Sequence, residues 1–169
     1  PEERRGDYFA QIAACRLGAR RLEELLDDRG SPLIRAAFEG IMKSGERRLR
    51  DGLKFIPNGS YAFEDVMDGD GLDAHDLPIA VRIDVEGDQI RFDFTGTSLQ
   101  VPGNMNTTVN ATQASVCYAL KALLDPNIPN SQGVLNVAEL IVPEATILNA
   151  AFPASVAARA HTCQRIVDV

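Results

Sequence analysis

The chain has 169 residues, of which 45% are hydrophobic and 24% charged, a composition typical of a folded domain with a real core. The formal net charge of −7, which no basic run offsets, argues against a protein that binds nucleic acid or anionic membranes. No apolar stretch approaches the ~20 residues that a membrane span needs. The three cysteines, Cys15, Cys117 and Cys163, lie far apart and form no CxxC motif. We therefore expect reduced thiols in a cytoplasmic protein, with Cys15 and Cys117 in the core, rather than a zinc ribbon or disulfide framework.

Two helices are predicted at the start of the chain, over residues 4–28 and 32–51. In the first, apolar side chains recur at steps of four and three residues, which places them on one face that we expect to pack on a core: Tyr8, Ile12, Cys15, Ala19, Leu22 and Leu26. The second helix has Ser31 as its N-cap and Pro32 in its first turn. The short turn 29–31 favours antiparallel pairing, so residues 1–51 are predicted to form a helical hairpin.

From residue 52 onward the pattern changes to a mixed α and β part that extends to residue 169. Strands are predicted at 60–67, 77–86 and 88–94, and the last two form a hairpin in which one face is buried and the other is charged. The acidic stretch 68–76 departs from an EF-hand loop at its fifth and sixth positions. We expect a solvated hairpin loop there, with His75 exposed; a loose cation site is the alternative.

The remaining predicted elements follow a polar loop. A helix capped by Asn106 or Thr108 ends before Asp125, and its apolar face is expected to contain Val109, Thr112, Val116, Ala119 and Leu123. A loop at 126–133, a strand at 135–143, a short extended piece at 146–148 and a helix at least from residue 162 complete the chain. The predicted fold class is α+β, with the N-terminal helical hairpin, an antiparallel β-hairpin or sheet, and further helices packed on the sheet.

Two groups of polar residues are candidates for substrate binding. The first belongs to the loop between the hairpin and the next helix, where Thr97, Asn104, Asn106 and Asn110 could line a pocket or could instead cap the backbone. The second is Arg159, His161, Gln164 and Arg165, which could bind a carboxylate or another anion, or could be ordinary charged helix surface. The chain lacks a P-loop, a dinucleotide fingerprint, HExxH and GxSxG, so no catalytic residue and no metal ligand is predicted within it.

Four segments of the chain resemble successive blocks of the hydantoinase B / 5-oxoprolinase family: GDYFAQIAACRLGARRL, FDFTGTSLQVPGNMN, YALKALLDPNIPNSQG and PASVAARAHTCQRIVDV. They occur in the family's order and cover nearly the whole chain. The chain also begins without Met and ends inside an apolar-periodic run. We therefore expect residues 1–169 to be a single internal segment of a larger hydantoinase B-like subunit, inactive by itself.

The resemblance implies an ATP-dependent hydrolase of cyclic amides, which opens hydantoin or 5-oxoproline rings within a hetero-oligomer. A hydantoinase A-like partner would bind ATP and Mg²⁺, and any further divalent metal would be bound outside this segment. The family also includes ketone carboxylases, which is one alternative function. Another alternative is a non-catalytic assembly module. An exposed apolar face between Tyr8 and Leu26 would favour the assembly module, whereas Asn104, Asn106 or His161 facing a pocket would favour the enzyme.

One departure from the family bears on the substrate. Where many ring-opening relatives carry a Gly-Asn run before the Gln-Arg pair, this chain has Ala158-Arg159-Ala160-His161-Thr162-Cys163. This difference argues against 5-oxoproline as the substrate, and Arg159 and His161 could meet a different acidic group.

Overall fold

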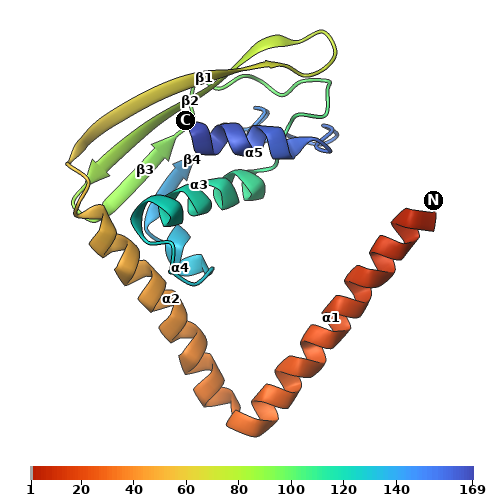
Figure 1. Cartoon of the computed structure of the whole chain (residues 1–169), viewed down its shortest axis with the longest axis vertical. Helices are drawn as coiled ribbons and strands as arrows, with labels where there is room; N and C mark the ends of the chain where they lie inside the picture. Colours follow the sequence, from red (N-terminus) through yellow and green to blue (C-terminus); the bar gives the residue numbers. More distant parts are fainter. Residues whose placement is uncertain (1) are drawn as a thin grey trace. The chain divides into compact units, whose positions relative to one another are not determined.

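A computed structural model describes residues 2–169 and has the predicted α+β class: two N-terminal helices, a four-stranded mixed sheet and further helices (Figure 1). The chain consists of two compact units, residues 1–41 and residues 42–169. Within residues 2–169, no helix is both long and apolar enough to cross a membrane.

The first helix, α1, spans Glu2–Arg29, and the second, α2, spans Ser31–Leu53 and continues into the second unit. Gly30 separates them with a φ of 80°, and its N–H group donates to the carbonyl of Leu26 at 2.8 Å, as a glycine that ends a helix commonly does. The antiparallel pairing of α1 with α2 stays a prediction.

The expected burial of one α1 face is wrong in this structure. Within residues 2–29 no side chain is buried, and Tyr8 is 65% exposed. Cys15, predicted to be a core residue, is also exposed. Apolar periodicity determines which side chains share a helix face, but it does not determine which surface covers that face.

The sheet lies in the second unit and has the order β1-β2-β3-β4. Its strands are β1 (Gly59–Gly69), β2 (His75–Glu86), β3 (Gln89–Asp93) and β4 (Ala138–Ile141). The first three pair antiparallel as predicted, whereas β4 pairs parallel with β3, which corrects the expectation of an antiparallel sheet. A parallel neighbour requires a crossover connection. Here that connection contains α3 (Val109–Leu124) and α4 (Gln132–Leu135).

Helices α3 and α5 (Arg159–Asp168) lie against one face of the sheet (Figure 1). The buried residues of α3 include Ser115 and Leu120, whereas Leu123, predicted to face the core, is 74% exposed. Cys117 is half-buried, and this burial raises the pKa of its thiol. The opposite face of the hairpin carries the predicted cross-strand ion pairs, Arg82 with Asp93 at 3.1 Å and Arg91 with Asp84 at 3.4 Å.

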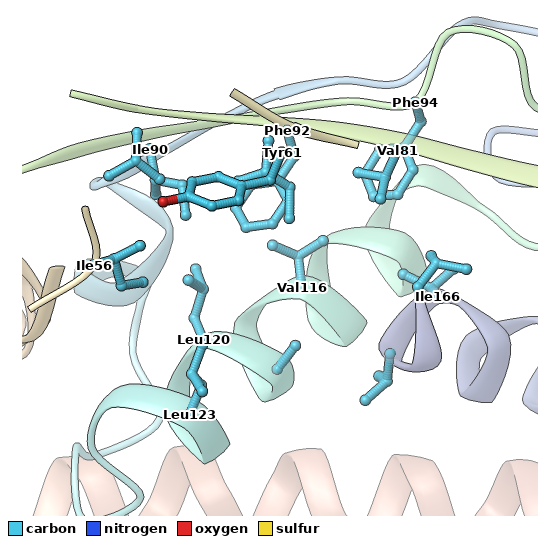
Figure 2. A pocket seen from close by; sticks show the side chains of 15 residues that line it. Ile56, Tyr61, Val81, Ile90, Phe92, Phe94, Val116, Leu120, Leu123 and Ile166 are labelled. Carbon is cyan, nitrogen blue, oxygen red and sulfur yellow. The ribbon is translucent and has the colours of Figure 1, made fainter. Parts of the chain in front are cut away.

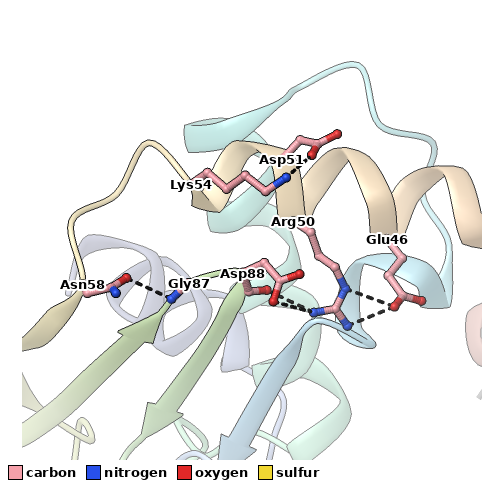
Figure 3. A network of polar contacts seen from close by, with 7 residues as sticks. All are labelled: Glu46, Arg50, Asp51, Lys54, Asn58, Gly87 and Asp88. Carbon is pink, nitrogen blue, oxygen red and sulfur yellow. Dashed lines mark hydrogen bonds and ion pairs between the residues drawn. The ribbon is translucent and has the colours of Figure 1, made fainter.

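The end of α2 is fixed to the hairpin by polar contacts (Figure 3). The guanidinium of Arg50 donates to the carboxylate of Glu46 at 3.0 Å and to the backbone carbonyl of Asp88 at 3.1 Å. The side-chain oxygen of Asn58 accepts from the N–H group of Gly87 at 2.9 Å. Leu49 and Leu53, on the same stretch of α2, are fully buried in the core of the sheet unit.

Candidate functional site

The loop that leads from β3 into α3 has a fully buried side chain, Asn106, at its centre. Its Oδ1 accepts from the N–H group of Val101 at 2.8 Å. Its Nδ2 lies within hydrogen-bonding distance of three carbonyl oxygens, those of Val101 (2.8 Å), Gly103 (3.0 Å) and Ser155 (3.0 Å). The protein backbone therefore occupies both the donor and the acceptor side of this amide. We call residues 101–107 the central loop.

Asp70, in the turn between β1 and β2, is a second anchor of the central loop. Its Oδ2 accepts from the N–H group of Gly103 at 2.9 Å, and its Oδ1 accepts from Leu72 at 2.9 Å and Ala74 at 3.2 Å. These N–H groups, that of Leu72 foremost, lower the pKa of the Asp70 carboxyl. Asp70 is only 5% exposed, so the acidic stretch 68–76 is not the uniformly solvated loop that its composition predicts. His75 is exposed, as expected.

Two further segments form hydrogen bonds with backbone groups of the central loop. The carbonyl of Asn104 accepts from the N–H group of Ala158 at 2.9 Å, and the carbonyl of Met105 accepts from the hydroxyl of Thr162. The N–H group of Thr107 donates to the carbonyl of Ile147 at 2.7 Å. The central loop is thus bonded to the β1–β2 turn, to the start of α5 and to the 146–150 segment.

The two predicted groups of site residues meet at the start of α5. Asn104 is exposed, and its carbonyl is bonded to Ala158, the residue that immediately precedes Arg159. Arg159 and His161 are both exposed in the first turn of α5, and the His161 N–H group donates to the Ala158 carbonyl at 3.1 Å. These three exposed residues lie at the junction between the central loop and the start of α5, and we call this junction the Asn104 face.

The other predicted site residues lie elsewhere. The hydroxyl of Thr97 is bonded to both the N–H group and the carbonyl of Ala80 at 3.2 Å, so it holds the loop against β2. Asn110 and Gln164 are exposed and line separate surface hollows beside α3. Arg165 pairs with Asp65 of β1. Of the eight candidates, Asn104, Arg159 and His161 are thus the exposed residues at the junction between the central loop and α5.

An apolar cavity of about 270 Å³ lies between the sheet and helices α3 and α5 (Figure 2). Its walls come from aliphatic and aromatic side chains such as Val81, Phe92 and Leu120. The hydroxyl of Tyr61 is the polar group at this wall in Figure 2, and it already donates to the carbonyl of Pro57 at 2.7 Å. A cyclic amide presents an N–H donor and a carbonyl acceptor, so this apolar cavity is chemically unsuited to it.

Among the described residues, no three side chains of His, Cys, Asp or Glu are grouped so that they could hold a metal ion. Asp70 was missed as a positioned side chain, because sequence reasoning weighed it as a cation ligand and not as an acceptor for backbone N–H groups. The glycines on both sides of it, Gly69 and Gly71, are the signal of a tight turn that could have identified it.

The fold and the loop sequence place the chain in a known class. The Hydantoinase B/oxoprolinase family model matches residues 1–169, so the chain belongs to this family. The B component of a putative D-/L-hydantoinase from Pseudomonas sp. (strain NS671) is 34% identical over 96% of this chain and 29% of that protein. Its name describes one subunit of a larger enzyme, as does that of the beta chain of the caprolactamase from Pseudomonas jessenii.

Two solved structures have the same fold. The crystal structure of the ATP-dependent caprolactamase from Pseudomonas jessenii matches 98% of this chain with a TM-score of 0.83 and 25% sequence identity. The nucleotide-free structure of acetone carboxylase matches 88% of the chain with a TM-score of 0.70, and at 18% identity it shows a likeness of fold alone. The chain spans less than a third of the length of each of these relatives.

Proposed function

We propose that the chain is part of an ATP-dependent cyclic-amide hydrolase that opens hydantoin-type or 5-oxoproline-type rings together with a hydantoinase A-like subunit. The observation that carries the proposal is the match of 98% of the chain to a caprolactamase described as ATP-dependent, since caprolactam is itself a cyclic amide. In this proposal ATP and Mg²⁺ are bound by the partner subunit, and any further divalent metal is bound outside residues 1–169.

The chemistry explains why such a reaction needs two functions, activation of the ring and retention of the activated ring. Amide resonance makes ring hydrolysis slow, and phosphorylation of the carbonyl oxygen converts that oxygen into a leaving group. The subunit that then receives the activated ring must hold it in position and limit its contact with water. We assign this holding role to the Asn104 face, because Arg159 offers bidentate hydrogen bonds to a carboxylate or phosphoryl group.

The test uses the complete subunit together with its A-like partner. ADP release is followed while hydantoins, 5-oxoproline, caprolactam, or a ketone with bicarbonate are offered one at a time. We expect turnover of ATP coupled to one of the cyclic amides. Turnover only with ketone and bicarbonate would replace the proposal with the carboxylase alternative.

Replacing Arg159 and His161 by Ala in the same complex tests the Asn104 face. We expect the KM for the cyclic amide to rise about tenfold, the usual cost of removing a charged hydrogen bond to a ligand. Replacement of Glu64, an exposed residue of β1 that is not among the candidate site residues, is the control. Equal KM values for all the variants would remove the Asn104 face from the proposed site.

A role in assembly is the second candidate function, and α1 is the observation that favours it. Large apolar side chains along this helix are exposed rather than buried, including Tyr8, Phe9, Ile12, Leu17, Leu22 and Leu25. Exposed apolar surface of this kind is typical of sites that contact other proteins.

Single substitutions in α1 test the assembly role. Ile12→Glu places a charge on the Tyr8–Leu26 face, whereas Ala13→Glu places the same charge on the side that carries Arg20 and Glu24. We expect Ile12→Glu to weaken association of the complete subunit with its A-like partner, measured by sedimentation, and Ala13→Glu to leave it unchanged. Equal association of both variants would exclude this face of α1 from the interface.

A further inference from the structure

We propose that Asp70 is a positioning residue: it fixes the central loop and, through that loop, the Asn104 face. This inference rests on the proposed function, because the Asn104 face is the surface to which that function assigns the substrate. Asp70 itself lies in the β1–β2 turn, far from that surface in sequence, and no residue of this turn was among the predicted site residues.

A hydrogen bond of Asp70 joins two segments that are distant in sequence. Gly103 lies 33 residues after Asp70, and its N–H group donates to Asp70 Oδ2 at 2.9 Å. The other carboxylate oxygen accepts from Leu72 and Ala74 within its own turn. One oxygen of Asp70 thus holds the turn, and the other holds the central loop.

The backbones of the β1–β2 turn and the central loop approach each other closely at this hydrogen bond. A Cβ atom added to Gly103 would lie 2.4 Å from the backbone oxygen of Asp70 and 2.7 Å from its Cβ atom. Real Cβ atoms do not come so close to other heavy atoms, so glycine is required at position 103. The carboxylate therefore acts across direct backbone contact and not across a water-filled gap.

Hydrogen bonds connect Gly103 and its neighbours to the start of α5. The Gly103 carbonyl accepts from Asn106 Nδ2 at 3.0 Å, and the same nitrogen contacts the Ser155 carbonyl at 3.0 Å. Asn104, the residue after Gly103, accepts from Ala158 at 2.9 Å. A shift of Gly103 would therefore move Asn104 and its contact with the first turn of α5.

Asp70→Asn separates the two functions of the carboxylate. The Asn side chain has the same shape and keeps one oxygen, which can still accept from Leu72 and Ala74 within the turn. Its Nδ2 atom cannot accept from the Gly103 N–H group. Asp73→Asn, at an exposed position of the same stretch, makes the same change of charge and serves as the matched control.

The first measurement is amide hydrogen exchange on the complete subunit. We expect Asp70→Asn to speed exchange in peptides covering the central loop about tenfold, the factor that corresponds to one lost hydrogen bond to a charged group. Peptides from β2 and β3 and the Asp73→Asn variant should exchange like the unchanged protein. Unaltered exchange of the central loop in Asp70→Asn would overturn the inference, and this result does not depend on which reaction the enzyme catalyses.

The second measurement is steady-state kinetics with the A-like partner present. We expect Asp70→Asn to raise the KM for the cyclic amide about fivefold, because the Asn104 face is displaced, and to leave the KM for ATP unchanged. A purely structural role would reduce the fraction of active enzyme and change neither KM. An unchanged KM for the cyclic amide would contradict the inference. Absence of ATP turnover with every cyclic amide would instead reject the proposed function and leave hydrogen exchange to decide the role of Asp70.

If Asp70→Asn does not fold, Asn104→Ala takes its place, because removal of this exposed side chain leaves the backbone bond to Ala158 intact. The expected result is the same rise in the KM for the cyclic amide alone. A KM equal to that of the unchanged enzyme would show that the Asn104 side chain does not contact the substrate, and the inference that Asp70 acts through the Asn104 face would then be overturned.

Discussion

At the scale of single residues, Asp70 links the stability of the sheet unit to pH. Its pKa is lowered in the folded protein by backbone N–H groups, so its contribution to stability is present above the unfolded pKa of about 3.9. That contribution is lost as the pH falls through the lowered folded pKa.

The prediction is a stability difference between the unchanged chain and Asp70→Asn that is constant above about pH 5 and shrinks steadily below it. Urea unfolding at a series of pH values measures this difference. Asp73→Asn, at an exposed position, should give no comparable trend. A difference that does not depend on pH would show that the Asp70 charge does not contribute to the stability of the sheet unit.

Replacing Asn106 and replacing Asn104 should have different effects on stability, although only one residue separates them. Asn106→Ala leaves several buried backbone groups without partners, and at about 1 kcal/mol or more for each we expect the free energy of unfolding to fall by about 3 kcal/mol. Asn104→Ala changes an exposed side chain, and we expect a change within about 0.5 kcal/mol. Chemical denaturation of both variants measures the contrast. Similar losses of unfolding free energy in the two variants would mean that the hydrogen bonds of the Asn106 amide do not stabilise the loop.

The difference between these asparagines could not be predicted from the sequence. Composition correctly marks the loop as rich in hydrogen-bonding groups, but one partner of Asn106, Ser155, lies 49 residues further along the chain. Which amide is buried depends on how the two segments meet. Sequence reasoning therefore proposes candidate site residues, but it does not predict which of their side chains are buried supports and which are exposed.

At the scale of helices and strands, the local sequence pattern predicts the position of an element where burial of one face determines that pattern. The alternation of apolar residues located β2 and β3 within about two residues of their observed ends, because one face of each strand is buried. The four-residue α4 is too short to show helical periodicity, and the prediction placed its first two residues in a loop and its last, Leu135, in a strand. The direction of β4 depends on the crossover through α3, which no short stretch of sequence specifies.

The close packing of α4 on α2 should make the stability of the chain sensitive to the residue at position 133. A Cβ atom on Gly133 would lie 2.1 Å from the backbone oxygen of Met42, so Gly133→Ala forces the two helices apart. We expect a loss of about 2 kcal/mol, typical of overpacking, in thermal unfolding of the complete chain. Gly40→Ala, two residues before Met42 in α2, is the control. Its added carbon meets nothing within 4 Å, and Ala should stabilise the helix by up to about 1 kcal/mol relative to Gly. Equal unfolding midpoints for the two variants would contradict this packing.

At the scale of the whole molecule, the hydrophobic core belongs to one of the two units. Every residue of the buried cluster lies between Leu49 and Ile166, inside residues 42–169. A chain of residues 42–169 should therefore unfold cooperatively within about 4 °C of the complete chain, a shift equivalent to about 1 kcal/mol for a domain of this size. Broad, non-cooperative melting of the shorter chain would show that residues 1–41 support the core.

Removal of residues 1–41 from the complete subunit then separates the two candidate functions. Because α1 buries none of its residues 2–29 and exposes large apolar side chains, we expect the deletion to abolish association with the A-like partner while the sheet unit stays folded. Sedimentation of the mixed subunits and hydrogen exchange of the β2–β3 hairpin measure the two effects on one sample. One outcome is that the shortened subunit fails to bind its partner while the β2–β3 hairpin keeps its protection from hydrogen exchange. That result would assign partner binding to the first unit, and the Asn104 face in the second unit would remain the proposed substrate site. Full association without residues 1–41 would exclude α1 from the interface, and the exposed apolar residues of α1 would then need another contact surface.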